Sequence, residues 1–302
     1  MSNDKVILIT GCSSPSGIGF ATARVLAKSG HRVFATVRDP SKAAKIQEGF
    51  KDDRLRVRIL DVTIQESIDA VIQEITEAEA RIDVLINNAG YGLLGAVEDV
   101  DLDRARAHFD TNVFGAVRMI QAVLPTMRRL RTGHIINVNS VFTSHHCIPG
   151  FGYYIGSKTA LDKMCEALAV EVAPWDIRVT NFQPGPVRTD LSREYGNRLK
   201  HLGNPYVHVV EDAYQWVFQK STAIETAEQV ATDLKDLIQQ VSPSLYHQSG
   251  EPAQAFVRER RPDPTGATHL RDFIEFFAFL ERQREREGAG GNQPEVFRAD
   301  ET

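Results

Sequence analysis

Residues 6–19 read VILITGCSSPSGIG, a short apolar run followed at once by a glycine-rich turn. The run Val6–Thr10 is apolar without alternation, which is typical of a parallel strand covered on both faces. From Gly19 to Ser29, apolar residues recur at helical spacing, and Gly30 provides a natural helix end. The stretch therefore predicts a strand, a tight turn and a helix, in that order.

The glycine-rich turn predicts a phosphate-binding site. Glycines let the backbone bend tightly and approach a pyrophosphate closely, and the helix that follows offers free amides and its positive dipole end. Such a turn can also be purely structural, but its place between a strand and a helix favours a dinucleotide site. The residues assigned to this site are Gly11, Ser13, Ser14, Gly17, Ile18 and Gly19.

The alternation of short apolar runs and amphipathic stretches continues along the chain. Further strands are expected at Arg32–Val37, Arg56–Leu60, Val84–Asn87, Gly133–Asn139 and Arg178–Gln183, and further helices at Ile64–Ala80, Asp103–Leu130 and Tyr154–Val172. This order implies right-handed crossovers. The expected fold class is α/β, a single-domain Rossmann-type doubly wound parallel sheet with helices on both faces.

The end of the second expected strand indicates which nicotinamide cofactor the chain prefers. An acidic residue there would bind the ribose 2′-hydroxyl group and repel a 2′-phosphate. The chain instead has Arg38, whose guanidinium can form charge-assisted hydrogen bonds to a phosphate. A solvated Arg38 paired with Asp39 is the alternative. The sequence thus favours NADP(H).

Tyr154 and Lys158 are four residues apart, a spacing that puts a phenol and an ammonium group on one face of a helix. A neighbouring cation stabilises tyrosinate, so we expect a lowered tyrosine pKa and proton exchange near neutral pH. This spacing also occurs by chance on protein surfaces. It gains weight from Ser140, which follows an expected strand and can hold a substrate oxygen. Asn112, a polar residue inside an expected helix, can carry a water or a backbone contact to Lys158.

Together these motifs resemble those of the short-chain dehydrogenase/reductase family, in its compact single-domain branch. The glycine turn matches at Thr10–Gly19, Asn-Asn-Ala-Gly stands at residues 87–90, and the resemblance runs from Lys5 to Asp190. It implies a catalytic tetrad of Asn112, Ser140, Tyr154 and Lys158. The cofactor contacts that it implies are Asp61 and Val62 at the adenine, Asn88, Ala89 and Gly90, Pro184, Gly185, Val187 and Thr189 beside the nicotinamide amide, and Tyr154 and Lys158 themselves.

Two stretches, Gly11–Ser14 and Val33–Pro40, resemble the branch that holds 17β-hydroxysteroid and retinol dehydrogenases. This implies NADP(H), bound through Arg38, and a lipophilic substrate. We therefore expect an NADPH-preferring oxidoreductase that moves a hydride between the nicotinamide and a ketone or secondary alcohol of a steroid-, retinoid- or polyketide-like molecule. The alternatives are an epimerase or dehydratase that uses bound cofactor transiently, and a non-catalytic NADP(H)-sensing protein, which need not keep Ser140, Tyr154 and Lys158.

The chain departs from the family pattern at two places. Five residues separate the first two glycines where three are usual, with Pro15-Ser16 as the apparent insertion, so the serine that meets the 2′-phosphate is not identified. Ser140 and Tyr154 are also one residue further apart than expected, which puts Tyr153 at the shorter spacing. Tyr154 is preferred because it lies four residues before Lys158.

Composition restricts the partners of the chain. A net charge of -5 over 302 residues argues against nucleic acid, and no apolar run approaches the roughly 18 residues of a membrane span. Three cysteines without a pairing framework, and no signal peptide, predict a cytoplasmic protein. His145-His146 has no third ligand at metal spacing, so no metal is expected. Apolar faces on the helices 103–130 and 154–172 resemble the family's dimer helices and predict a homodimer or homotetramer.

The expected organisation is a catalytic domain over residues 1–250, with a substrate-loop region at 191–222. We expect the substrate pocket to form from this region, from loop 91–97 and from the loop after Ser140. Residues 251–284 are expected to form a helical extension packed on the same domain. The charged and glycine-rich stretch 285–302 is predicted to be disordered.

Overall fold

The computed structural model describes residues 4–48, 53–144, 148–188, 206–218 and 224–258, with Glu275, Ala278, Phe279 and Arg282. These residues contain a seven-stranded sheet in the order β3-β2-β1-β4-β5-β6-β7, and every neighbouring pair is parallel. The strands are β1 Val6–Ile9, β2 Arg32–Val37, β3 Leu55–Ile59, β4 Val84–Asn87, β5 Gly133–Val138, β6 Ile177–Gln183 and β7 Tyr246–Gln248.

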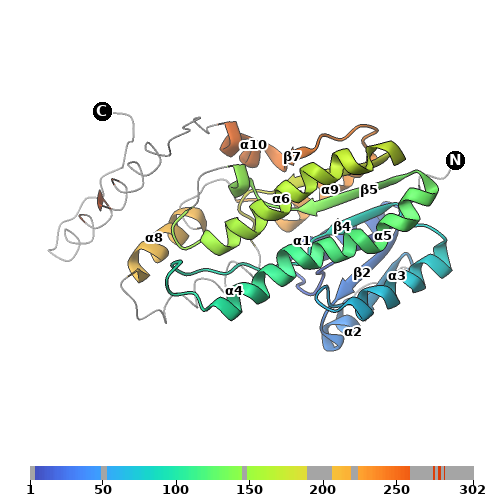
Figure 1. The fold of residues 1–302 in the computed structure, drawn as a ribbon, viewed down its shortest axis with the longest axis horizontal. Coiled ribbons are helices and arrows are strands. Elements are labelled where there is room, and N and C mark those ends of the chain that lie inside the picture. Colours follow the sequence, from blue (N-terminus) through green and yellow to red (C-terminus); the bar gives the residue numbers. More distant parts are fainter. Residues whose placement is uncertain are drawn as a thin grey trace.

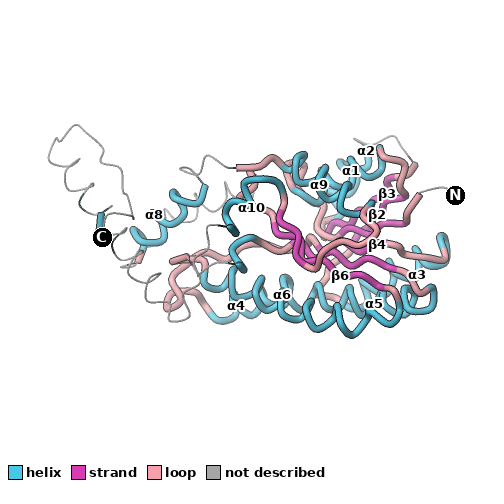
Figure 2. The backbone as a smooth tube through the Cα atoms, turned by 90° about the horizontal axis from the view of Figure 1, so that it is seen from above, coloured by secondary structure: helices cyan, strands magenta, loops and turns pink. Residues whose placement is uncertain are grey.

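Helices cover both faces of the sheet, as Figures 1 and 2 show. One face carries α1 (Ile18–Lys28), α2 (Pro40–Glu48) and α9 (Ala227–Gln239), and the other carries α3 (Gln65–Glu79), α5 (Ala116–Leu130) and α6 (Gly152–Val172). Each layer has its own buried apolar cluster against the sheet. The remaining described helices are α4 (Leu102–Phe109), α8 (Val207–Phe218) and α10 (Gly250–Arg258). The α/β doubly wound fold expected from the sequence is confirmed.

The prediction of one continuous α-helix over 103–130 is wrong. The stretch divides into α4, a π-helical turn over Asp110–Gly115, and α5. A π turn inserts one extra residue into a helix and shifts the hydrogen-bond ladder, which apolar periodicity alone does not reveal. The turn contains Asn112, whose side chain is buried.

Among the described helices and strands, α2, α8, α9 and β7 were not predicted. β7 has only three residues, Tyr246, His247 and Gln248, and no apolar run that would mark a strand. It forms because its backbone pairs with the last residues of β6, from Asn181 to Gln183. The pairing is tertiary and cannot be seen in the local sequence.

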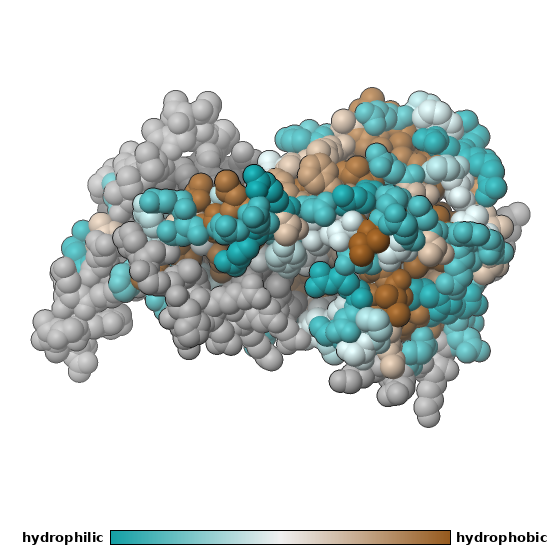
Figure 3. Space-filling view, turned by 60° about the horizontal axis from the view of Figure 1, so that its bottom comes forward, coloured by the Kyte–Doolittle hydropathy of each residue, from teal (hydrophilic) through white to brown (hydrophobic). Residues whose placement is uncertain are grey.

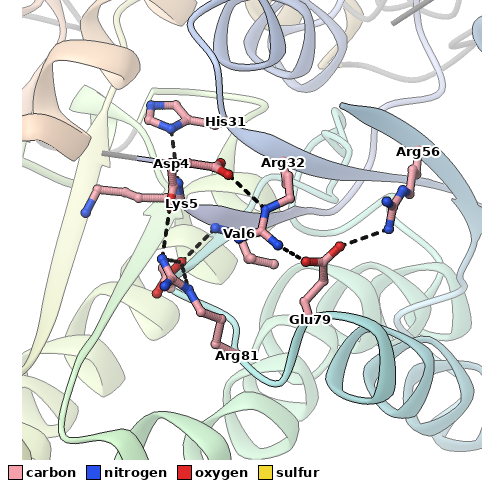
Figure 4. A network of polar contacts seen from close by, with 9 residues as sticks. Asp4, Lys5, Val6, His31, Arg32, Arg56, Glu79 and Arg81 are labelled. Carbon is pink, nitrogen blue, oxygen red and sulfur yellow. Dashed lines mark hydrogen bonds and ion pairs between the residues drawn. The ribbon is translucent and has the colours of Figure 1, made fainter. Parts of the chain in front are cut away.

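Charged residues join the strands at their amino ends (Figure 4). Glu79, at the end of α3, is paired with Arg32 of β2 and, at 2.9 Å, with Arg56 of β3. Asp83 accepts a hydrogen bond of 2.7 Å from the backbone amide of Val6. These contacts tie β2 and β3 to α3, and β1 to the residue before β4, at the edge of the sheet opposite the candidate site.

The described part of the chain contains no helix long and apolar enough to cross a membrane. α10 lies at the start of the predicted extension 251–284, and Ala253 of this helix is buried in an apolar cluster with residues of α6 and α8. The stretch 285–302 lies outside the described residues. The boundaries predicted for the extension and the tail therefore stay predictions.

Candidate active site

The glycine turn after β1 is held by the segment that follows β4. Gly11 has φ +73°, and a Cβ atom there would lie 2.6 Å from the Cα atom of Ala89. The Asn88 side chain donates hydrogen bonds to the carbonyl groups of Thr10 at 2.9 Å and Gly11 at 3.0 Å. A Cβ atom on Gly19 would lie 2.4 Å from the Asn88 Nδ2 atom. The Asn88 side chain thus holds the turn, and a side chain at Gly11 or Gly19 would clash with this segment.

The N-terminus of α1 fits a phosphate ligand. Gly17 is its N-cap, no side chain caps the helix, and its first turn has no acidic residue. The backbone amides from Ile18 onward therefore point out of the helix end without a side-chain acceptor, which is the arrangement that binds anions.

The insertion in this turn forms a turn of its own. Pro15 and Ser16 lie at its tip, and the amide of Gly17 donates a 2.9 Å hydrogen bond to the carbonyl group of Ser14. The Ser14 and Ser16 hydroxyl groups are 3.3 Å apart. The additional residues therefore form a bulge before the helix and leave the helix N-terminus open.

The predicted adenine-side residues lie at the carboxyl ends of β2 and β3. Arg38 directly follows β2 and is exposed. Asp61 accepts two hydrogen bonds from Thr63, one from its amide at 2.9 Å and one from its hydroxyl group at 2.7 Å. Val62 is buried against Gly115, and a Cβ atom on Gly115 would lie 2.6 Å from the Val62 Cγ2 atom. Because the strands are parallel neighbours, the structure brings Arg38 and Asp61 to the edge that carries the glycine turn.

Ser140 and Tyr154 come together beyond the carboxyl end of β5. Their side chains are close enough for Ser140 to influence the pKa of the Tyr154 phenol, and the Ser140 Oγ atom accepts a hydrogen bond from the amide of Phe142 at 3.3 Å. Burial raises the pKa of Tyr154, and the Ser140 side chain opposes this rise. The expectation of a lowered tyrosine pKa is therefore wrong for the protein alone, because desolvation of the phenolate is the largest effect.

Lys158 is buried one helical turn after Tyr154. Its Nζ atom donates a 2.8 Å hydrogen bond to the carbonyl group of Val138, at the end of β5. Burial lowers the pKa of Lys158 to about 8. A Cβ atom on Gly90 would be 3.7 Å from the Nζ atom, an ordinary contact distance, so Gly90 lies next to the ammonium group.

The two adjacent tyrosines point in different directions. The Tyr153 hydroxyl group donates a 3.3 Å hydrogen bond to the carbonyl group of Val97, and its ring packs on a separate apolar cluster that contains Leu93. Tyr154 packs on the cluster beside Ser140. A 3₁₀ turn over Val141–Ser144 takes up part of the chain between the serine and the helix, so the longer spacing is compatible with contact between Ser140 and Tyr154.

The side chain of Asn112 is held by the segment that follows β4. Its Oδ1 atom accepts from the amide of Tyr91 at 3.0 Å, and its Nδ2 atom donates to the carbonyl group of Tyr91 at 2.9 Å. The Nδ2 atom also lies 3.2 Å from the Ser157 Oγ atom and 3.3 Å from the His108 Nε2 atom. Neither His108 nor Ser157 was predicted. Burial and the charge of Lys158 lower the pKa of His108 to about 4, so its ring is neutral at physiological pH.

The loop after β6, residues 184–188, lies beside Ser140. The carbonyl group of Pro184 accepts a 3.2 Å hydrogen bond from the amide of Val141, and Val187 forms a parallel bridge with Glu225. Of the residues predicted for the nicotinamide end, Pro184, Gly185 and Val187 are in this loop, and Thr189 lies outside the described residues. Glu225 was missed, because one acidic residue before a helix carries no signal in the sequence.

No group of three or more possible metal ligands occurs within the described ranges, and His145 and His146 lie outside them.

A parallel doubly wound sheet with an open helix N-terminus, and a serine, tyrosine and lysine at its carboxyl edge, defines the class of Rossmann-type oxidoreductases. Residues 5–200 match the short chain dehydrogenase family. The chain belongs to this family.

Three curated proteins of similar sequence are named for reduction or dehydrogenation of different molecules. The chain is 41% identical over 188 residues to a 3-ketodihydrosphingosine reductase of Bacteroides thetaiotaomicron, a match that covers 62% of this chain and 66% of that protein. It is 32% identical to human 17-beta-hydroxysteroid dehydrogenase type 1, covering 88% and 83% of the two chains. It is also 32% identical to human retinol dehydrogenase 8, covering 88% of each.

Solved structures agree with the fold. A short-chain dehydrogenase from Streptomyces avermitilis superposes with a TM-score of 0.73 at 27% identity, covering 97% of this chain and 100% of that one. An NAD⁺-bound xylitol dehydrogenase has a TM-score of 0.71 at 24% identity, covering 83% and 100%. The NADP-bound protein ElxO has a TM-score of 0.69 at 22% identity, covering 83% and 99%. Since the same fold binds either cofactor, the fold alone does not select one.

Proposed function

We propose that the protein is an NADPH-preferring oxidoreductase that transfers a hydride between the nicotinamide and a ketone or secondary alcohol of a hydrophobic molecule. The observation that carries this proposal is the proximity of the Ser140 side chain to the Tyr154 phenol, with Lys158 buried one turn further along α6. A proton donor and a hydrogen-bond partner for the same substrate oxygen thus lie together at the carboxyl edge of the sheet.

The preference for NADP(H) rests on Arg38. Its exposed guanidinium at the end of β2 is free of burial and carries the charge that a 2′-phosphate requires. Asp39 directs its carboxylate to the amide of Ser41, at 2.9 Å. The glycine turn and the open N-terminus of α1 would hold the pyrophosphate, and loop 184–188 would meet the nicotinamide amide.

When bound, NADPH would supply the hydride. In the reductive direction Tyr154 gives its phenolic proton to the substrate oxygen, while Ser140 holds that oxygen in place. The raised pKa of Tyr154 keeps the phenol protonated at neutral pH, which suits this direction. Lys158 presents a buried cation beside the tyrosine and would bind the ribose hydroxyl groups. Asn112, through its contacts with Tyr91, keeps the π turn and the 87–90 segment together next to Lys158.

A hydrophobic substrate is favoured by the apolar cluster around Tyr154. The cluster gathers side chains from the 3₁₀ turn, α6, α8 and α10: Val141, Phe142, Ile148, Phe151, Ile155, Ala213 and Ala253, with Leu94 and Val257 at its border. Sphingoid bases, steroids and retinoids, named in the relatives, are all lipophilic. Much of the predicted substrate-loop region 191–222 lies outside the described residues, and α8 is its described helix.

We also propose a homodimer or homotetramer that works in the cytoplasm. Apolar side chains are exposed on the π turn and α6, with Phe114 at 50% and Val170 at 77%, and Figure 3 shows hydrophobic patches that interrupt the polar surface. Association through the helices of this layer would cover them. Cys12 and Cys165 are free and buried, which suits a reducing compartment.

The test is NADPH oxidation by the purified protein, with 3-ketodihydrosphingosine, estrone and all-trans-retinal as substrates. We expect turnover of at least one ketone or aldehyde, and none with Tyr154→Phe. An epimerase or dehydratase would change a substrate without net oxidation of NADPH. Binding of NADPH without any turnover across a broad carbonyl panel would favour the sensing protein.

A further inference from the structure

Glu225 is a buried acidic residue that this mechanism does not use. It stands just before α9 with 6% of its surface exposed, and burial raises the pKa of its carboxyl group. A carboxyl group removed from water is costly unless the protein supplies hydrogen-bond partners. Ala227, two residues further on, and Val187, its bridge partner, are core residues, so an apolar side chain would meet a purely structural need at this position.

The partners of Glu225 come from two loops at the carboxyl edge of the sheet. The Ser249 hydroxyl group, fully buried after β7, donates to the Oε1 atom at 3.4 Å. The backbone amide of Gly185, in the loop after β6, is close enough to lower the pKa of the carboxyl group, and the buried Oε2 atom has no hydrogen-bond partner among the described residues. The backbone of Glu225 also donates to Pro186 at 3.1 Å and accepts from Arg188 at 3.1 Å.

The surrounding chain leaves room for this carboxyl group. Gly250 has φ +64°, and a Cβ atom there would lie 2.5 Å from the Oε1 atom of Glu225. A side chain at residue 250 would therefore displace the carboxyl group as well as strain the backbone. On the other side, a Cβ atom at Gly185 would be 3.7 Å from the Oε2 atom, an ordinary contact distance.

The loop that Glu225 holds is also tied to the candidate active site. Its first residue, Pro184, accepts a 3.2 Å hydrogen bond from the amide of Val141, which directly follows Ser140. The amide of Ser249 donates to the carbonyl group of Gln183 at 3.1 Å, so both loops leave the sheet side by side. Ligands of parallel α/β sheets bind outside this edge.

We propose that Glu225 is a positioning residue whose buried carboxyl group fixes loop 184–188 in the conformation that receives the nicotinamide end of the cofactor. It acts through the Gly185 amide and the Ser249 hydroxyl group and does not touch the cofactor. The inference rests on the proposed function, because it assumes that NADP(H) binds with its nicotinamide beside this loop.

The experiment compares two ligands that share one half. NADPH carries the nicotinamide, whereas 2′,5′-ADP has the adenosine and the 2′-phosphate without it. For Glu225→Ala we expect NADPH to bind about tenfold more weakly and 2′,5′-ADP to keep its affinity within about twofold, since only the nicotinamide end depends on the loop. Glu225→Gln should stay within about threefold of wild type for both ligands, because its amide can accept from Gly185 and donate to Ser249.

Glu228→Ala is the matched control, since Glu228 is an exposed acid three residues away in the first turn of α9. Wild-type NADPH affinity in Glu225→Ala would overturn the inference, and so would an equal loss for both ligands, which indicates general damage. If Glu225→Ala does not fold, Ser249→Ala takes its place with an expected loss of about threefold for NADPH alone; no change there would also overturn it. Failure of the proposed function looks different: the wild type would then not bind NADPH.

Discussion

Asn112 and the backbone of Tyr91 form a reciprocal pair of hydrogen bonds, 3.0 Å from the Tyr91 amide to Oδ1 and 2.9 Å from Nδ2 to the Tyr91 carbonyl group. An asparagine is one of the few side chains that can serve a backbone amide and carbonyl at once. The pair joins the π turn to the segment after β4, beside Gly90 and Lys158. Both the Oδ1 and the Nδ2 atoms of Asn112 are thus hydrogen bonded to the protein backbone.

Asn112→Ala should therefore reduce both stability and turnover. It removes the Asn112 side chain that bonds the partly buried amide and carbonyl groups of Tyr91, at a cost of about 1–3 kcal/mol each where water cannot replace it. We expect a melting temperature several degrees lower and a fall in kcat of at least about tenfold. Thr111→Ala is the control, because Thr111 is the preceding residue and its hydroxyl group only contacts the carbonyl group of Ala107 at 3.2 Å. Unchanged stability in Asn112→Ala would contradict this view.

Arg38→Asp should reverse the cofactor preference. The substitution removes a charge-assisted hydrogen bond to the 2′-phosphate and adds a like charge, so NADPH affinity should drop by about 10² while NADH affinity stays nearly constant. Dissociation constants for both cofactors, measured by fluorescence titration, give the ratio. Arg104→Asp repeats the charge change on an exposed site of α4 and should leave the ratio unaltered. Equal affinities for NADPH and NADH in the wild type would contradict the proposed preference for NADP(H).

The pH dependence of reduction should follow Lys158. Its pKa of about 8 means that the ammonium group is intact at neutral pH and is lost as the pH rises through 8. Tyr154, with its raised pKa, keeps its proton over the same range. In the free enzyme, kcat/KM for NADPH should therefore be level below pH 7 and fall above pH 8, whereas oxidation, which needs tyrosinate, should fade as the pH drops. A flat kcat/KM profile to pH 10 would rule out this role of the lysine.

A stability measurement checks the same pKa without turnover. Because the folded-state pKa of Lys158 lies below the ordinary 10.5, the unfolded chain binds more protons between pH 8 and 10.5. Lys158 should thus make the protein more stable as the pH rises through this window. The melting temperature of wild type, compared with that of Lys158→Met, should therefore be more favourable at pH 9.5 than at pH 7.5.

The sequence predicts those parts of the molecule that depend on local patterns. The apolar strands and the glycine turn follow from residues close together in the chain, and β1, β2 and β4 begin at the predicted residues. What it does not predict depends on tertiary contacts. β7 exists through pairing with β6, and the π turn shows only as a shift in hydrogen bonding. The raised pKa of Tyr154 likewise reflects burial that spacing to Lys158 cannot reveal.

The choice between the adjacent tyrosines yields the sharpest test. Tyr154 lies next to Ser140, whereas Tyr153 donates to the carbonyl group of Val97 and packs on a different cluster. Tyr154→Phe keeps the ring but removes the proton donor, so kcat should fall by about 10²–10⁴ with NADPH affinity nearly unchanged. Tyr153→Phe, the matched control, loses one peripheral hydrogen bond and should keep kcat within about threefold. Steady-state rates and NADPH titrations on the two variants decide. If Tyr153→Phe were inactive and Tyr154→Phe active, the reactive phenol would be Tyr153, and Ser140 would have to reach it through a different conformation of the 3₁₀ turn.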